Sequence, residues 1–307
     1  MRELLQRLGS DVVGRHRELE LVVAALGADR HILLEGPPGT GKSTLLRAVA
    51  RELGIGFEFV EGNAELTPAR LVGHFDPARV LTDGYSPDVF EDGPLTSALR
   101  GGSLLYVEEI NRIPEETLNV LITVMSEREL NVPRLGRIPA ARGFRLVAAM
   151  NPFDAIGTAR ISSAVYDRVC RLSVDYQGPE DEEAIVARAV DGSASYPPDW
   201  LHKVVKVVRM TRAHSDLRVG SSVRGAIDCA LVARSLSELR NLPIEHPLTG
   251  LDAALVALSG RVRLREGSVR RTEDIVREIW ADVFGTQVED NREGKVGAPT
   301  GATTSPS

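Results

Sequence analysis

Residues 31–50 read HILLEGPPGTGKSTLLRAVA, and this stretch decides the fold. The apolar run at 31–34 is typical of a strand, and the residues that follow Lys42 are typical of a helix. Between them lies a match to G-x-x-x-x-G-K-[ST], a pattern whose glycines let backbone N–H groups turn inward around phosphate oxygens. The helix adds the positive end of its dipole. The sequence therefore predicts a phosphate-binding loop.

The side chains of this loop have separate expected roles. Lys42 supplies a positive charge for the β- and γ-phosphates, and the hydroxyl of Ser43 is expected to bind Mg²⁺. The alternative is a glycine-rich turn that binds nothing, but a strand before the motif and a helix after it argue against that. The loop residues expected to contact a nucleotide are Gly36, Pro37, Pro38, Gly39, Thr40, Gly41, Lys42, Ser43 and Thr44.

Short apolar runs alternate with helical patterns up to about residue 176. A helical pattern is clear at Leu118, Leu121, Ile122 and Met125, which share one face of a helix. Alternation of this kind predicts an α/β core with a mostly parallel sheet and right-handed crossovers. The expected strands lie at 31–34, 57–60, 104–107, 144–149 and 169–174.

Two carboxylates follow the third of these strands. The sequence LLYVEE at 104–109 is an apolar strand that ends in Glu108 and Glu109. The carboxyl ends of parallel strands open onto the ligand crevice, on the same edge as the phosphate-binding loop. We assign Glu108 to Mg²⁺ and Glu109 to polarising the attacking water. An ordinary acidic turn is the alternative.

The region from 178 to 285 has helical periodicity and little strand pattern. Pro179 and the acids after it indicate a helix start, because proline suits the first turn and acids suit the positive dipole end. We predict a core domain at 1–177 and an all-helical lid domain at 178–285. Residues 286–307 are rich in Gly, Thr, Ser and Pro, which predicts a disordered tail.

Composition excludes several classes of protein. Lys and Arg total 37 against 43 Asp and Glu, a net charge of −6, and aromatic residues are only 5%. Both values argue against a protein that coats nucleic acid. Two cysteines cannot build a disulfide framework, and no signal peptide or membrane-spanning run is present, which predicts a cytoplasmic protein. The six histidines lack metal-ligand spacing, so no structural metal site is expected.

The motifs together resemble a known family. The stretches GPPGTGKST, LLYVEEINRIPEE, AAMNP, YDR at 166–168 and GSSVRGA at 220–226 are similar to those of the MoxR-type branch of the AAA+ ATPases. The resemblance covers about residues 10–285. One departure is Glu108, where such proteins usually have Asp, and its longer side chain can still reach Mg²⁺ through water.

The resemblance also implies roles for single residues. Asn151 matches the sensor 1 position, which orients the attacking water, although asparagine at a strand end is also a good turn residue. Arg168 matches the arginine finger that reaches the nucleotide of a neighbouring subunit, with a surface ion pair as the alternative. Arg224 matches sensor 2, which contacts the γ-phosphate from the lid. Val13 and Gly14 lie where relatives pack against the adenine.

Two further segments resemble insertions of this branch. Residues 74–92 match the helix-2 insert, where Asp83-Gly84 is a hairpin turn signal. Residues 129–143 match the pre-sensor hairpin. In AAA+ rings such loops can face the pore or a partner, and a solvated hairpin is the alternative.

The resemblance implies a Mg-ATP-dependent ATPase that forms a homo-oligomeric ring, usually a hexamer. Its relatives remodel, assemble or supply a metal cofactor to a protein client, together with a separate von Willebrand A-domain protein. One alternative is a nucleic-acid motor, since helicase relatives share the inserts. A second is a nucleotide switch with weak hydrolysis, which is suggested by Glu108.

Overall fold

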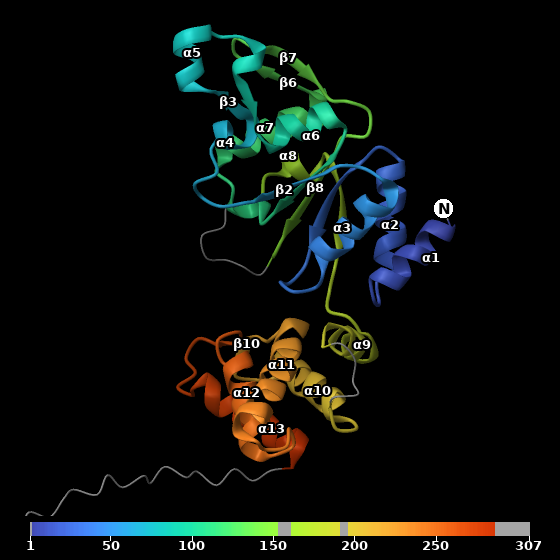
Figure 1. Cartoon of the computed structure of the whole chain (residues 1–307), viewed down its shortest axis with the longest axis vertical. Helices are drawn as coiled ribbons and strands as arrows, with labels where there is room; N and C mark the ends of the chain where they lie inside the picture. Colours follow the sequence, from blue (N-terminus) through green and yellow to red (C-terminus); the bar gives the residue numbers. More distant parts are fainter. Residues whose placement is uncertain (1, 153–160, 191–195, 286–307) are drawn as a thin grey trace, which may run out of the picture. The chain divides into compact units, whose positions relative to one another are not determined.

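The computed structural model describes residues 2–152, 161–190 and 196–285, and it separates into two units (Figure 1). The first unit contains the described residues up to 190 together with Ser222–Arg224. The second unit contains 196–221 and 225–285. The tail that we predicted at 286–307 lies outside the described residues.

A five-stranded parallel sheet forms the centre of the first unit, with the order β2-β5-β8-β1-β9. Each strand coincides with one of the five apolar runs in the sequence, so the predicted α/β class is confirmed. The three central strands β5, β8 and β1 are covered on both faces, which explains their mostly apolar composition, whereas the edge strands β2 and β9 are partly exposed and carry polar residues. The strands are β1 (His31–Glu35), β2 (Phe57–Glu61), β5 (Leu104–Glu108), β8 (Arg145–Met150) and β9 (Val169–Ser173).

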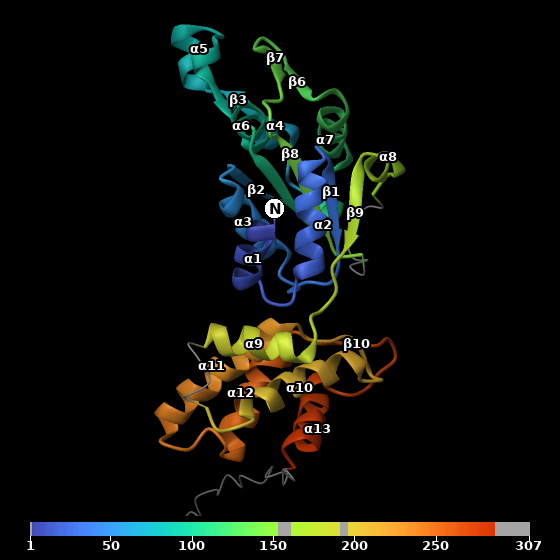
Figure 2. The same ribbon diagram turned by 90° about the vertical axis from the view of Figure 1, so that its right-hand side faces the viewer.

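Helices cover both faces of this sheet (Figures 1 and 2). On β1, Ile32 and Leu34 pack into one apolar cluster and Leu33 packs into the other, because successive side chains point to opposite faces. The cluster around Ile32 includes side chains of α1 (Arg2–Asp11), α2 (His16–Gly27) and α3 (Lys42–Leu53). The cluster around Leu33 includes side chains of α4 (Pro68–Val72), α6 (Pro94–Gly101) and α7 (Glu115–Glu127).

Two insertions extend the first unit at the same end (Figure 1). Residues 129–143 form the expected hairpin, with β6 and β7 antiparallel. Residues 74–92 differ from the prediction, because Asp83-Gly84 is not a hairpin turn. Asp83 ends the helix α5, and Gly84, with φ of 72°, follows it as the cap. The elements of both insertions are β3 (Gly73–Phe75), α5 (Pro77–Asp83), η1 (Pro87–Val89), β4 (Phe90–Asp92), β6 (Glu129–Val132) and β7 (Gly136–Pro139).

The remaining elements of the first unit are short, apart from α9. A single turn, η2 (Ile110–Arg112), follows β5, and α8 (Ser163–Tyr166) precedes β9. Helix α9 (Pro179–Ala189) begins at the predicted proline, with acidic residues in its first turn. It belongs to the first unit. The boundaries of domains that fold independently, 1–177 and 178–285, stay a prediction.

The second unit is helical, as the sequence predicts, with one addition. Leu217–Val219 and Arg263–Leu264 form a short antiparallel pair, β10 and β11, which is too short to leave a pattern in the sequence. Helices α10 and α13 each bury an apolar stripe, in agreement with the helical periodicity of this region. The helices are α10 (Trp200–Ala213), α11 (Val223–Arg240) from Gly225 onward, α12 (Pro247–Leu258) and α13 (Thr272–Phe284).

Candidate functional site

The predicted phosphate-binding loop joins β1 to α3. Gly39 and Gly41 have φ of 75° and 80°, a backbone region that favours glycine. Lys42 is the first residue of α3, and its side chain is buried beneath the loop. Its ammonium group donates to the carbonyl oxygens of Gly36 and Pro37 at 3.0 and 2.8 Å. The loop therefore curls around one cation at the positive end of a helix.

Gly36 is required by a close backbone approach. A Cβ atom at this position would lie 1.9 Å from the carbonyl oxygen of Val174. The Gly36 N–H donates to the carbonyl oxygen of Met150 at 3.1 Å, which joins the loop to the end of β8. Within the loop, the buried Thr40 hydroxyl donates to the Pro37 carbonyl, whereas Pro38 and Thr44 are exposed.

Burial changes the acidity of the lysine. Desolvation lowers the pKa of Lys42 from 10.5 to about 8, and the nearby charge of Arg15 acts in the same direction. The carboxylate of Glu108 opposes this shift by favouring the charged form. Lys42 is therefore a cation held in a site that lacks the full negative charge needed to stabilise it, which is what a phosphate would supply.

Oxygen ligands meet beside the lysine. The Ser43 hydroxyl donates to a Glu108 carboxylate oxygen at 3.0 Å and lies 3.2 Å from the Tyr106 hydroxyl. Burial raises the pKa of Tyr106, so this hydroxyl stays protonated. A hydroxyl and a carboxylate in contact fit Mg²⁺, which prefers hard oxygen ligands and commonly takes the rest of its shell from phosphates and water. Among the described residues no group of three or more His, Cys, Asp and Glu is placed to hold a metal.

Glu109 adopts an unusual conformation directly after β5. Its φ is 52°, which is uncommon for a residue other than glycine. Its carboxylate forms an ion pair with Arg112 at 3.0 Å, and both side chains are partly exposed. The two neighbouring carboxylates therefore have different partners, Ser43 for Glu108 and Arg112 for Glu109.

Two more predicted residues lie on the first unit. Asn151 directly follows β8, the strand between β5 and β1, so it lies at the same sheet edge as the loop and Glu108. Arg168 lies between α8 and β9, where its guanidinium donates to the Ala164 carbonyl at 2.8 Å and to the Ser126 hydroxyl. Its contact with Asp167 is long, at 3.9 Å. The surface ion pair with Asp167 is thus weak.

The other predicted residues lie at helix starts. Val13 and Gly14 form the turn between α1 and α2, with Gly14 at φ of 67°. Arg224 is the second residue of α11, and it is exposed. Whether Val13 and Gly14 contact adenine and Arg224 contacts a γ-phosphate stays a prediction.

Sequence reasoning missed the part played by Arg15. Its side chain is only 4% exposed and donates to the carbonyl oxygens of Thr40 at 2.9 Å and Asp175 at 2.5 Å. It also pairs with Glu18 at 3.1 Å. Arg15 therefore joins the phosphate-binding loop to the segment after β9. An arginine before a helix is usually solvated, so no pattern in the sequence could have distinguished it.

A cation–π contact joins the two insertions of the first unit. The Arg134 guanidinium lies 3.8 Å from the ring centre of Tyr85, which links the β6–β7 turn to the segment after α5. Leu81 on α5 is 87% exposed. The insertions thus expose an apolar side chain, Leu81, and a cationic side chain, Arg134.

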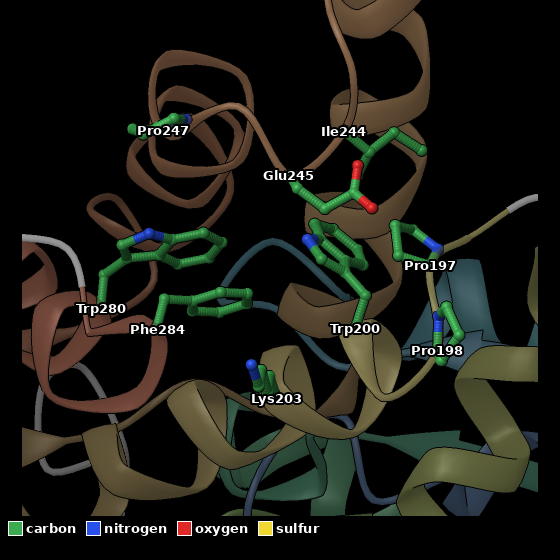
Figure 3. Close-up of a pocket in the computed structure, with 9 residues that line it drawn as sticks. All are labelled: Pro197, Pro198, Trp200, Lys203, Ile244, Glu245, Pro247, Trp280 and Phe284. Atoms are coloured by element: carbon green, nitrogen blue, oxygen red, sulfur yellow. The ribbon is translucent and has the colours of Figure 1, made fainter.

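The second unit contains a separate cavity of about 200 Å³ (Figure 3). Trp200 and Trp280 are buried and form part of its walls. Glu245 and Lys203 are its charged residues, and Lys203 lies over the ring of Phe284. An aromatic cavity with one charge of each sign does not suit a triphosphate. The other lining residues are Pro197, Pro198, Ile244 and Pro247.

Comparison of the sequence with known proteins identifies relatives of the first unit. Residues 31–169 match the model of the AAA domain, dynein-related subfamily. The chain is 33% identical over 180 residues to Protein MoxR of Methylorubrum extorquens, covering 58% of this chain and 50% of that protein. It is 30% identical over 179 residues to Chaperone MoxR1 of Mycobacterium tuberculosis, covering 58% of this chain and 45% of that protein. The chain thus spans about half the length of these relatives.

Solved structures share the fold. A putative ATPase from Cytophaga hutchinsonii has a TM-score of 0.52 and 21% identity, covering 91% of this chain and 92% of its own. The RuvB Holliday junction branch migration motor of Thermotoga maritima has a TM-score of 0.52 and 20% identity, covering 80% of this chain and 68% of its own. In the described part of this chain, each helix is too short or too polar to cross a bilayer.

Proposed function

We propose that this chain, whose residues 31–169 match the AAA domain of the dynein-related subfamily, is a MoxR-type, Mg-ATP-dependent ATPase that acts as a ring. The observation that carries the proposal is the contact between Ser43 and Glu108 beside the buried Lys42. It joins the phosphate-binding loop after β1 to Glu108 at the end of β5, which is the arrangement that nucleotide hydrolysis requires.

ATP binding is the first step of this function. The inward-turned N–H groups of the loop and the start of α3 would surround the phosphates, and Lys42 would neutralise them. Ser43 and Glu108 would hold Mg²⁺, which supplies positive charge against the charge that builds up on the phosphate oxygens. Val13 and Gly14 would contact the adenine.

Hydrolysis requires a water to be oriented. We assign this to Glu109, with Asn151 at the adjacent strand end. Glu109 must exchange its ion pair with Arg112 for a contact with water, and an exposed ion pair of this kind costs little to break. Arg224 would contact the γ-phosphate in its own subunit.

The site is completed by a neighbouring subunit. Arg168 would act as an arginine finger on the nucleotide of the next copy, where it stabilises the transferred phosphoryl group. Activity therefore depends on assembly into a homo-oligomeric ring, which we expect to be a hexamer.

The work of the ring is proposed to be done on another protein. The relatives named MoxR and Chaperone MoxR1 support a chaperone-like role. We propose that hydrolysis drives remodelling, assembly or metal-cofactor activation of a protein client, together with a separate von Willebrand A-domain protein. The exposed Leu81 and the Arg134–Tyr85 contact lie on insertions suited to meet such partners.

Exchange of Glu109 for Gln tests this function. The variant keeps the shape of the side chain but removes its charge, so ATP binding and ring formation should persist while phosphate release falls by at least about a hundred-fold. Nucleotide binding, phosphate release and light-scattering mass report the three properties separately. Glu116→Gln, an exposed carboxylate on α7, is the matched control and should keep wild-type turnover. Unchanged turnover of Glu109→Gln would reject the assignment.

A second candidate, a nucleotide switch, is favoured by two observations. Glu108 stands where relatives usually have Asp, and Glu109 is paired with Arg112. A switch predicts ATP binding without turnover in the wild-type protein at concentrations where rings form.

A nucleic-acid motor instead predicts salt-dependent DNA affinity and hydrolysis stimulated by DNA.

A further inference from the structure

A buried acid lies at the end of β1, outside the proposed machinery. Glu35 is only 3% exposed, and it directly precedes Gly36 of the phosphate-binding loop. One of its carboxylate oxygens accepts from the Tyr166 hydroxyl at 2.9 Å, and the other accepts from Arg171. Both donors belong to the segment formed by α8 and β9, which lie side by side (Figure 2).

The buried carboxylate of Glu35 needs hydrogen-bond donors, and this need explains its contacts with Tyr166 and Arg171. A buried carboxylate is costly unless it is paired and hydrogen-bonded, so Glu35 holds both donors in place. Burial and the hydrogen bond to Glu35 raise the pKa of Tyr166, which keeps its hydroxyl protonated as a donor. Tyr166 is 39% exposed, so the hydrogen bond to the carboxylate adds to partial packing in fixing where the side chain lies.

Tyr166 lies two residues before Arg168, on the same turn of chain. The Arg168 side chain donates to the Ala164 carbonyl within α8, and the Asp167 N–H donates to the Ser163 carbonyl at 3.0 Å. A displacement of Tyr166 therefore moves the whole turn and Arg168 with it. On the other side, the Glu35 carbonyl accepts from the Val174 N–H at 2.7 Å, so the acid itself is held by the sheet.

We propose that Glu35 and Tyr166 are positioning residues for Arg168, which they hold in place to reach the nucleotide of the neighbouring subunit. This rests on the proposed role of Arg168 as a finger. Because Glu35 adjoins the phosphate-binding loop, one hydrogen bond links the loop of a subunit to the finger that it offers to the next.

Tyr166→Phe removes the hydroxyl and keeps the ring. Homogeneous rings of this variant should lose roughly ten-fold in kcat, while KM for ATP stays within about two-fold, because the subunit's own nucleotide site is intact. Tyr196→Phe, in the second unit, is the matched hydroxyl deletion, because it removes a hydroxyl that donates to the Ala230 carbonyl at 3.1 Å, and it should keep the wild-type kcat. Thermal unfolding and light-scattering mass verify that each variant folds and assembles.

Mixed rings show in which subunit Tyr166 acts. Glu109→Gln subunits hydrolyse nothing but carry an intact Tyr166 and Arg168. Mixed in equal parts with them, Tyr166→Phe subunits receive normal fingers, so phosphate release should rise about five-fold above the mean of the two pure proteins. Arg168→Ala mixed with Glu109→Gln is the positive control, and it should be rescued in the same way.

The outcomes separate this proposal from the function on which it rests. Rescue of both Arg168→Ala and Tyr166→Phe supports it. Rescue of Arg168→Ala alone, with Tyr166→Phe impaired and not rescued, places Tyr166 in its own nucleotide site and overturns the proposal. Wild-type turnover of Tyr166→Phe overturns it as well. If Arg168→Ala itself is not rescued, the finger does not act between subunits, and the proposed function fails at that point.

Glu35→Gln provides a second route to the same answer. The amide keeps an oxygen for Tyr166 but loses the charge that holds Arg171. We expect a smaller loss of kcat than for Tyr166→Phe, rescued by the same mixing. A loss that appears as weaker ATP binding instead would place Glu35 in the phosphate-binding loop's own function and contradict a positioning role.

Discussion

Lys42 combines two properties that rarely occur together, since it is buried and it is needed as a cation. Its ammonium group contacts two carbonyl oxygens of its own loop, and desolvation lowers its pKa to about 8. A bound triphosphate stabilises the charged form, so the pKa rises when nucleotide binds. Protonation and nucleotide binding are therefore linked at this residue.

This linkage predicts how affinity depends on pH. Below pH 8 the free protein already holds the proton, whereas above pH 8 binding must take one up. Affinity for ATP should fall about ten-fold between pH 7 and pH 9. A fluorescent ATP analogue measures it directly. Lys42→Arg stays charged over this range and corrects for titration of the nucleotide, and a flat wild-type profile would contradict the linkage.

Single residues also show where sequence reasoning ends. Lys42 and Ser43 were predicted from the loop motif and Glu108 from its place at the end of a strand, and the structure brings the three together. The contacts of Arg15, Glu35 and Tyr166 were not predicted, although Tyr166 belongs to the YDR motif, because each contact is made with residues far away along the chain. Hydrogen bonds between distant segments depend on how the strands pair, which no local pattern records.

At the scale of elements, the phosphate-binding loop depends on the register of β1 and β9. Val174 follows β9, and its carbonyl oxygen lies against the Cα of Gly36. The two strands pair from His31 with Val169 to Glu35 with Ser173. The strand pair therefore sets the space in which the loop begins.

Gly36→Ala tests this dependence. The new methyl group would meet a backbone oxygen at 1.9 Å, which cannot move without shifting β9. We expect a loss of about 2–3 kcal/mol in the free energy of unfolding, together with weaker ATP binding. Denaturant-induced unfolding measures the free energy of unfolding. Gly27→Ala, at a helix position with open space around it, should be neutral or stabilising, and equal stability of both variants would contradict the account.

Elements were predicted best where an apolar pattern spanned at least four residues. The five strands of the sheet and the stripe on α7 were all confirmed. The segment 74–92 was predicted wrongly at Asp83-Gly84, because a turn signal of this type also suits the end of a helix. The strands β10 and β11 were too short to be seen.

At the scale of the whole molecule, the two units differ in what they can bind. The first contains a cation, a hydroxyl and carboxylates gathered at one sheet edge. The second contains an aromatic cavity with a single carboxylate and a single ammonium (Figure 3). Composition and periodicity distinguished the α/β region from the helical region, but the cavity depends on packing between helices and could not be predicted.

The central claim is that a triphosphate binds around Lys42 with Mg²⁺ beside Ser43 and Glu108. Calorimetric titration of the whole chain with ATP and Mg²⁺ tests it most directly. We predict saturable heat with one site per chain for the wild-type protein and none for Lys42→Ala. Thermal unfolding curves verify that both proteins are folded. Absence of heat with the wild-type protein, or equal heat with Lys42→Ala, would contradict the claim.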